Sequence, residues 1–208
     1  MTATSPLRIT AIALDLGNVL VRVDHYRFCR GLADHAQAPL AAAEVYAAVF
    51  DAGLEPGYDT GRISSEEFYQ RVMSRFRLAL PYPLFCRLWT EIFDPMEDME
   101  EVVAHLALKY PLFLVSNTNS LHFDYIRGRF PLLRHFRQFI LSYLVGSRKP
   151  EAGIYQALIR QAGLLPKNIL FVDDKPPFVN AAQNHGLTAW PFTTPQDFQT
   201  DLKQHGLW

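Results

Sequence analysis

Four groups of polar residues in this chain of 208 residues each follow a short apolar stretch. They are Asp15, Ser116 with Asn117, Lys149, and Asp173 with Asp174. Carboxylates, a hydroxyl and an ammonium group are side-chain types that bind ions and act as nucleophiles, acids or bases in active sites. One such group would carry little information, but four groups with complementary chemistry indicate a single site.

The first group shows why the whole set is needed. Residues 9–16 are apolar except for Thr10 and Asp15, and Gly17 and Asn18 follow them. This pattern predicts a buried strand that stops near Asp15 and opens into a tight turn. Taken alone, Asp15 is explained equally well by a turn-capping role and by chemistry.

The second half of the chain must position these groups, and it alternates between two apolar patterns. We expect strands over residues 112–115, 139–145, 169–172 and 187–191, and helices over residues 99–110, 121–130, 151–162, 177–185 and from 195 onward. Strands that alternate with helices form a parallel sheet covered on both faces. The prediction is an α/β fold with a Rossmann-like, doubly wound parallel sheet. The carboxyl ends of parallel strands share one edge, where all four groups can converge.

Residues 24–93 contain no convincing strand pattern. Apolar residues recur there at helical spacing, Ser64 and Glu67 form a capping box, and the glycines and proline of residues 53–61 indicate a loop. We therefore expect an all-helical insertion. The predicted domains are an α/β core of residues 1–21 and 94–208 and a helical domain of residues 22–93.

The composition excludes several classes of protein. The net charge is −1, so no basic excess points to nucleic acid, and no apolar run is long enough to span a membrane. Residues 1–7 lack the features of a signal peptide, and the two cysteines suggest free thiols in a reducing compartment. We expect a cytoplasmic protein, monomeric or homodimeric, with a small-molecule partner.

The four groups, in this order and at these approximate spacings, resemble the motifs of the haloacid dehalogenase-like (HAD) hydrolase superfamily. The matching segments are residues 15–20 (DLGNVL), 114–119 (LVSNTN), 148–151 (RKPE) and 171–174 (FVDD). The helical insertion after the first motif resembles the helical cap of that superfamily. The first two motifs, with Leu121 and His122, are similar to the branch that contains α-D-glucose-1-phosphate phosphatase.

The resemblance implies chemistry on a phosphoryl group. Asp15 is the expected nucleophile, which attacks phosphorus in line and forms an aspartyl-phosphate that water hydrolyses. Ser116 and the Asn117 amide are expected to hold phosphoryl oxygens. Lys149 is expected to balance the negative charge of Asp15 and of the transferring group.

Asp15, Asp173 and Asp174 together place three carboxylates near an anionic substrate, which one lysine cannot offset. A hard divalent cation on oxygen ligands can, and Mg²⁺ is the natural choice. Asp174 is the first candidate for a direct ligand, and Asp173 is either a second ligand or the partner of Lys149. The resemblance also implies the backbone carbonyl of Gly17 as a metal ligand.

Gly17 departs from the commonest pattern of the superfamily, which has a second aspartate there as general acid and base. Glycine cannot protonate a leaving group, so we expect slow turnover of ordinary alkyl phosphates and less effect on anomeric phosphates. Asp24 or His25 could replace the missing acid, although a helix start explains both residues better.

Residues outside the motifs carry weaker expectations. Asn180 is expected to orient the loop of the fourth motif through hydrogen bonds around the metal ligands. Tyr46, Tyr58, Arg62 and Trp89 could face the substrate, but packing or a surface position is the better explanation for each.

Three functions fit these observations. The leading hypothesis is a Mg²⁺-dependent phosphatase that acts on a small phosphorylated metabolite, for example a sugar phosphate. A metal-independent haloacid dehalogenase is the second, because a halide leaves without a proton, but the carboxylates would repel a haloacid anion. A non-catalytic binding protein that has kept the fold is the third.

Overall fold

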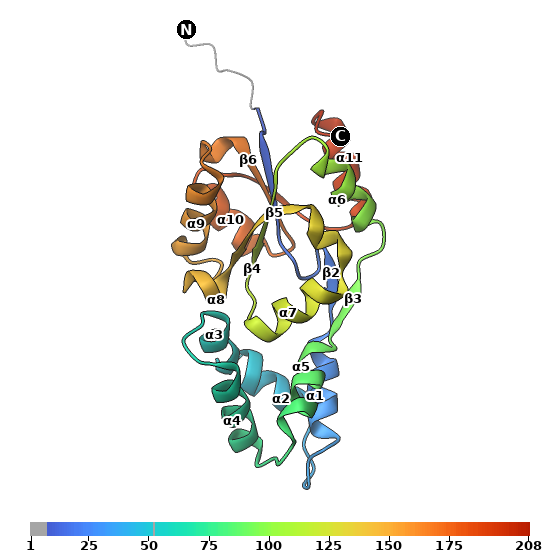
Figure 1. Cartoon of the computed structure of the whole chain (residues 1–208), viewed down its shortest axis with the longest axis vertical. Helices are drawn as coiled ribbons and strands as arrows, with labels where there is room; N and C mark the ends of the chain where they lie inside the picture. The colour runs from blue at the N-terminus through green and yellow to red at the C-terminus, as the bar shows by residue number, and fades with distance from the viewer. Residues whose placement is uncertain (1–7, 52) are drawn as a thin grey trace.

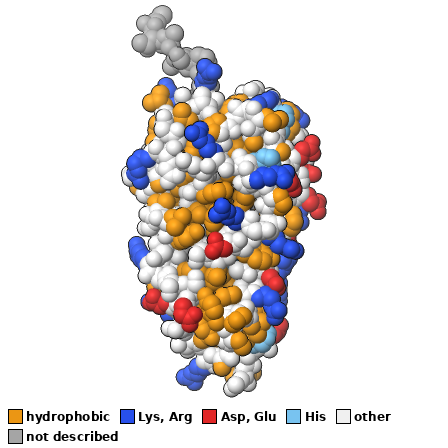
Figure 2. Space-filling model, in the orientation of Figure 1, with side chains coloured by type: hydrophobic (Ala, Val, Ile, Leu, Met, Phe, Trp, Pro, Cys, Tyr) orange, Lys and Arg blue, Asp and Glu red, His pale blue; other side chains and the backbone are white. Residues whose placement is uncertain are grey.

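The computed structural model describes residues 8–51 and 53–208, so the expectation for residues 1–7 lies outside the described residues. An α/β core carries a helical unit at one end (Figure 1). On the face drawn in Figure 2, acidic and basic side chains are interspersed, in keeping with the net charge of −1.

The core sheet has parallel strands in the order β5-β4-β1-β6-β7. Their bounds are Ala11–Leu14 for β1, Leu112–Ser116 for β4, Phe136–Leu141 for β5, Ile169–Asp173 for β6 and Thr188–Pro191 for β7. β1 lies at the centre, where Ile12 is opposite Leu112 on one side and Leu170 on the other. Every residue of β1, β4 and β6 is buried. The predicted α/β fold with a parallel sheet is confirmed.

Helices cover both faces of this sheet (Figure 1). On one face lie α6 (Met99–Ala107), α7 (Ser120–Arg129), the 3₁₀ turn η2 (Pro131–His135) and α11 (Pro195–Gln204); on the other lie α9 (Ala152–Ala162) and α10 (Pro176–Asn184). Ile12 and Leu14 of β1 pack toward the first group, and Ala11 and Ala13 pack toward the second. A second 3₁₀ turn, η3 (Pro166–Asn168), precedes β6. Within the described ranges, no helix combines the length and apolar character needed to cross a membrane.

The described residues between 24 and 92 form the helical unit. It contains α1 (His25–Ala33), α2 (Ala42–Tyr46), the π-helical turn η1 (Ala47–Asp51), α3 (Leu54–Asp59), α4 (Ser65–Phe76) and α5 (Tyr82–Thr90). These elements have an apolar core of their own, in which the rings of Phe28 and Trp89 lie 4.8 Å apart, edge to face. Ser64 begins α4 by accepting the Glu67 N–H at 3.1 Å.

Two short antiparallel strands join the helical unit to the core. In β2 (Val21–Val23) and β3 (Phe93–Pro95), Val21 is opposite Pro95 and Val23 is opposite Phe93. Strands of three residues are too short to show an alternating pattern, so the sequence did not predict them. Because β2 precedes the helical unit and β3 follows it, their pairing holds the two connecting segments side by side.

The predicted strand over residues 139–145 is wrong in its bounds. β5 ends at Leu141, and Ser142–Val145 forms the short helix α8. The Ser142 hydroxyl accepts the Thr118 N–H at 2.9 Å and donates to the Thr118 carbonyl at 3.0 Å. These hydrogen bonds to a segment 24 residues earlier compete with the strand, although the side chains that follow favour strands.

The predicted loop over residues 53–61 is also wrong, because it contains α3. Gly53 and Gly61 flank this helix with φ values of 96° and 67°. Pro56 is its third residue, where the backbone N–H would have no partner within the helix. At Gly61 an added Cβ would collide with the Tyr143 carbonyl, so glycine also permits the helical unit to approach the core closely.

Candidate active site

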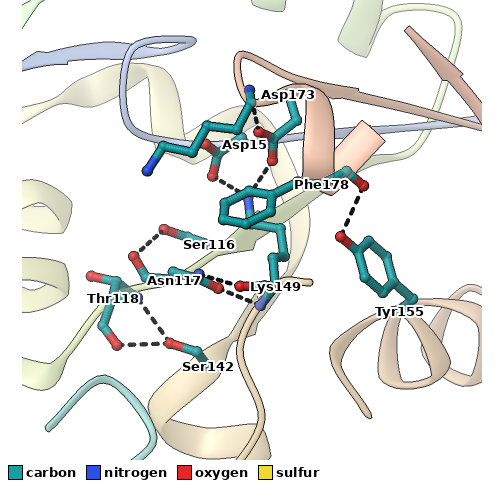
Figure 3. Close-up of polar contacts among 10 residues, drawn as sticks. Asp15, Ser116, Asn117, Thr118, Ser142, Lys149, Tyr155, Asp173 and Phe178 are labelled. Atoms are coloured by element: carbon teal, nitrogen blue, oxygen red, sulfur yellow. Dashed lines mark hydrogen bonds and ion pairs between the residues drawn. The ribbon is translucent and has the colours of Figure 1, made fainter. Parts of the chain in front are cut away.

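The carboxyl edge of the sheet gathers the predicted groups. Asp15 follows β1 directly, Ser116 is the last residue of β4, and Asp173 ends β6 with Asp174 next. Lys149 reaches the same place from the loop between α8 and α9 instead of from a strand end. Figure 3 shows the carboxylates of Asp15 and Asp173 directed at the ammonium group of Lys149.

The side chain of Lys149 is buried between two aspartates. Its Nζ lies 2.6 Å from Asp15 Oδ1 and 2.5 Å from Asp173 Oδ2. Burial alone would lower the pKa of Lys149, but the two carboxylates raise it above its ordinary value, so the ammonium stays charged. Burial raises the pKa of Asp15 to about 7, although Lys149 opposes the rise.

Asn117 fixes the backbone from which Lys149 extends. The Lys149 N–H donates to Asn117 Oδ1 at 2.7 Å, and Asn117 Nδ2 donates to the Lys149 carbonyl at 2.9 Å (Figure 3). The side chain of Asn117 therefore positions the lysine. The backbone N–H of Asn117 has no acceptor among the described residues, so it is free to donate a hydrogen bond to an anion.

Ser116 is buried beside Asp15, and its hydroxyl forms only a weak hydrogen bond within the protein. Its Oγ donates to the Asn117 carbonyl at 3.3 Å, a long hydrogen bond. The hydroxyl can therefore turn toward an anion without breaking a strong internal contact.

Three aspartates bring their carboxylate oxygens close together at this edge of the sheet. Carboxylate oxygens of Asp15, Asp173 and Asp174 all lie within 4.8 Å of one another. Both oxygens of Asp173 are engaged, because Oδ2 accepts from Lys149 Nζ and Oδ1 accepts the Lys175 N–H at 2.9 Å. Asp174 Oδ1 is buried with no hydrogen-bond partner among the described residues. A buried, unpaired carboxylate oxygen beside other carboxylates suits a hard divalent cation, so this donor set fits Mg²⁺.

The turn after Asp15 contains Gly17, so only backbone atoms of that residue line the site. Asn18 has the left-handed φ of 57° that the turn needs, and its N–H donates to the Val21 carbonyl at 2.6 Å. Gly17 lines the cavity, and no carboxyl group stands at that position. The role of the Gly17 carbonyl as a metal ligand stays a prediction.

Two residues considered from the sequence do not reach the site. Asp24 caps α1, with Oδ1 accepting the Tyr26 N–H and Oδ2 accepting from Arg30, each at 2.9 Å. Asp24 therefore marks the start of a helix, as the sequence analysis preferred, and does not stand at the site as an acid. Asn180 is exposed on α10 and makes no hydrogen bond to the loop after β6 within the described chain, so its predicted role in orienting that loop has no contact to support it.

His25 begins α1 and lines the cavity, but it does not fit the missing acid. Its ring packs against Phe50, with the centroids 4.4 Å apart. Burial, reinforced by Lys175, lowers the pKa of His25 to about 4. The imidazole is therefore neutral near physiological pH and has no acidic proton to give.

Both the sequence and the fold match known proteins. The haloacid dehalogenase-like hydrolase family matches residues 9–186 of the chain. The chain belongs to this family. A D-ribitol-5-phosphate phosphatase from Bacteroides thetaiotaomicron is 23% identical over 203 residues, which cover 93% of this chain and 97% of the relative.

Solved structures of a HAD family enzyme from the same organism agree with this membership. One has a TM-score of 0.82 at 23% identity and covers 93% of this chain and 98% of its own. Another, a complex with magnesium and inorganic phosphate, has a TM-score of 0.76 at 22% identity and covers 89% of this chain and 95% of its own. The family predicted from the four motifs is confirmed, and the finer likeness to α-D-glucose-1-phosphate phosphatase stays a prediction.

Around the HAD motifs, the structure adds cavity residues that the sequence did not single out. A cavity of about 110 Å³ in front of Asp15 is lined by Glu55 and Asp59 of α3 and by Arg148 and Lys175 of the core. Arg148 is the first residue of the third motif segment and Lys175 directly follows the fourth, which was the available signal. Glu55 and Asp59 lie in a segment whose glycines and proline led to the prediction of a loop, although it forms the helix α3.

The aromatic and basic side chains considered for this role lie elsewhere. Tyr58 and Trp89 are buried in the apolar core of the helical unit, Tyr46 packs against it, and Arg62 is exposed. None of the four lines the cavity in the described structure. Packing or a surface position, the preferred explanation, is confirmed for them.

A buried polar network joins the HAD core to the helical unit. Asn119 donates to Asp59 Oδ1 and to His122 Nδ1, each at 3.1 Å, and its Oδ1 accepts from Trp89 Nε1 at 3.2 Å and from the His122 N–H at 3.1 Å. His122 Nε2 lies 2.9 Å from the Trp89 carbonyl, which can only accept, so that nitrogen carries the proton. Every polar atom of the Asn119 side chain is thus satisfied, and the network fixes Asp59 against the core.

Proposed function

We propose that the protein is a Mg²⁺-dependent phosphatase that hydrolyses a phosphate monoester of a sugar or sugar alcohol through an aspartyl-phosphate intermediate. The observation that carries this proposal is the burial of Lys149 between Asp15 and Asp173, beside an unpaired oxygen of Asp174. This arrangement offers a nucleophile, a fixed positive charge and cation ligands at one point.

The relatives support the class of reaction and of substrate. One is a D-ribitol-5-phosphate phosphatase, and a solved neighbour is a complex with magnesium and inorganic phosphate; both match nearly the whole chain. At 23% identity this likeness supports a small sugar or sugar-alcohol phosphate as a class. We infer that the helical domain of residues 22–93 acts as the cap over that substrate.

In the proposed mechanism, the side chains divide the work at the phosphoryl group. Asp15 attacks phosphorus as the ester P–O bond breaks, and the leaving alkoxide takes its proton from solvent because no acid stands at position 17. Water then hydrolyses the aspartyl-phosphate to phosphate and restores Asp15, whose carboxylate the ammonium group of Lys149 orients. The Ser116 hydroxyl and the Asn117 backbone N–H hold phosphoryl oxygens. Lys149 keeps its positive charge throughout, because the second carboxylate, from Asp173, remains paired with it.

Asp15 and Asp174, with the carbonyl of Gly17, would hold the magnesium ion. When bound, the ion supplies positive charge that stabilises the phosphoryl oxygens. Asp173 then acts as the partner of Lys149 rather than as a direct ligand, since both of its oxygens already accept hydrogen bonds.

The two other hypotheses fit the site less well. Without a cation, Asp15, Asp173 and Asp174 place three carboxylates within 4.8 Å of one another beside the buried ammonium group of Lys149, and a haloacid anion would be repelled at that point. A non-catalytic binding protein would have no need for a carboxylate, that of Asp15, buried against Lys149 in the wall of the cavity.

A release assay separates the three functions. The chain is incubated with sugar phosphates, sugar-alcohol phosphates, nucleotides and haloacids, each with Mg²⁺ or with a chelator. The phosphatase proposal predicts phosphate release with Mg²⁺ and none with the chelator. Halide release in the chelator would instead support a dehalogenase, and ligand binding without any release would support a binding protein.

A further inference from the structure

We propose that Glu55 and Asp59 of α3 bind the hydroxyl groups on the carbon chain of the substrate and thereby select polyhydroxylated phosphate esters. The inference rests on the proposed phosphatase function and assigns its substrate specificity to two side chains. Both line the same cavity as Asp15 but enter it from the helical unit, whereas the phosphate-binding groups enter from the core.

The placement of the two acidic residues on α3 is the first argument. They are four residues apart, so they lie on one face of the helix, and that face is turned into the cavity. Two carboxyl groups at this spacing destabilise a helix when both are charged. Neither forms an ion pair with any described basic residue within 4 Å. A helix that only had to pack would gain nothing from this pair.

The way Asp59 is held is the second argument. Its side chain is buried, and Oδ1 accepts from Asn119 Nδ2 at 3.1 Å. Asn119 is itself fixed by hydrogen bonds to Trp89 and His122. The carboxyl group of Asp59 is therefore held in one orientation, and Oδ2 has no partner within the described chain. A rigid acceptor in a cavity is the arrangement that recognises a hydroxyl donor.

The basic and acidic side chains of the cavity match different parts of a phosphate ester. Arg148 and Lys175 line it from the core. They form no ion pair within 4 Å with a described acidic residue, although their charges lower the pKa values of Glu55 and Asp59, and with Lys149 they suit a phosphate dianion. A carboxyl pair would repel that dianion. Glu55 and Asp59 therefore match the neutral part of the ester, and hydroxyl groups are the neutral donors that carboxyl oxygens accept.

The protonation of the pair supports this assignment. Burial and the neighbouring Asp59 raise the pKa of Glu55 well above its ordinary range, and burial raises the pKa of Asp59 to about 6. Arg148 and Lys175 oppose both rises. A carboxyl group with a raised pKa keeps its proton to higher pH, and the protonated form donates a hydrogen bond as well as accepting one. A polyol, in which every hydroxyl donates and accepts, uses both kinds of group.

Two phosphate esters with the same carbon count test the inference. D-Ribitol 5-phosphate and n-pentyl phosphate both lose a primary alkoxide, but only the first carries hydroxyls on its chain. With Mg²⁺ and the full chain, Glu55→Ala should lower kcat/KM for the ribitol ester about 30-fold or more and change it within about threefold for the pentyl ester. Glu55→Gln, which keeps the size and the hydrogen bonding, should lose less, and Glu66→Gln on an exposed face of α4 should change neither value.

The outcomes distinguish the proposals. Equal losses on both esters would overturn the inference, because they would indicate proton transfer or a structural role for Glu55. Wild-type protein that hydrolyses both esters equally well would also overturn it and leave the phosphatase proposal standing. Wild-type protein that releases phosphate from neither ester nor from the wider panel would overturn the proposed function, and this inference with it.

Discussion

The ammonium group of Lys149 lies 2.6 Å from the carboxylate of Asp15, and both side chains are buried. Asp173 completes the arrangement at 2.5 Å. The lysine keeps Asp15 close to ionisation in a place where burial would otherwise protonate it. One cation between two carboxylates therefore serves both the stability of the fold and the chemistry of the site.

Replacing Lys149 by methionine should destabilise the protein, because two buried carboxylates lose their partner. We expect the free energy of unfolding to fall by about 3 kcal/mol near neutral pH in a chelator. The loss should shrink at about pH 5, below the pKa of about 7 that burial gives Asp15, because a protonated Asp15 needs no cation. Urea denaturation at both pH values measures this, with Lys167→Met, at an exposed lysine, as the control. An equal loss at both pH values would contradict the account.

Magnesium binding should depend on pH through Asp15. The metal-free protein holds a proton on Asp15 up to a pKa of about 7, because burial disfavours the charged form. Magnesium must displace that proton, so its affinity should fall about tenfold for each pH unit below neutrality and level off above about pH 8. Calorimetric titrations in buffers of different ionisation enthalpy count the protons released. A Mg²⁺ affinity that does not change between about pH 5.5 and 8 would count against Asp15 as a ligand of the ion. The Asp174→Asn variant should bind Mg²⁺ weakly at every pH.

Installing a carboxyl group at Gly17 should restore the missing acid. An added Cβ there lies 3.2 Å from Val23 Cγ2, so a small shift of one side chain accommodates it. With Mg²⁺, Gly17→Asp should turn over an alkyl phosphate at least about tenfold faster than Gly17→Asn, which has the same shape without the acid. An aryl phosphate, whose leaving group needs no proton, should show little difference. If the two variants behave alike on the alkyl ester, the chain already has another acid.

The network around Asn119 should fix the helical unit to the core. Asn119→Ala removes four hydrogen bonds and leaves the indole N–H of Trp89 and one oxygen of Asp59 buried without partners. We expect the free energy of unfolding to fall by about 3 kcal/mol. Urea denaturation tests this against Asn184→Ala, at an exposed asparagine of α10. A loss no larger than that of the control would show that apolar contacts alone hold the two parts together.

Much of the core could be predicted because its signals are local. The apolar runs before Asp15 and Asp173 mark strands buried on both faces, and in a parallel sheet their ends share an edge. The convergence of these carboxylates follows from topology alone. The pairing of Asp173 with Lys149, by contrast, was left open, because the sequence gives no distance between side chains.

The missed features depend on contacts between distant segments. Ser142 ends β5 early only because Thr118 offers its backbone groups, and no local pattern shows that. The glycines and proline around α3 have the composition of a loop, yet they stand at positions where a helix tolerates them. Glu55 and Asp59 were therefore hidden, and with them the part of the site that faces the rest of the substrate.

The most direct measurement is phosphate release from D-ribitol 5-phosphate, with Mg²⁺, by the wild-type chain and by Asp15→Asn. Asparagine keeps the shape of the side chain and removes the nucleophilic oxygen. The account predicts release by the wild type and a loss of about a thousandfold or more in the variant, with the fold intact by circular dichroism. Release by Asp15→Asn within about tenfold of the wild type would contradict the central claim that Asp15 carries the reaction.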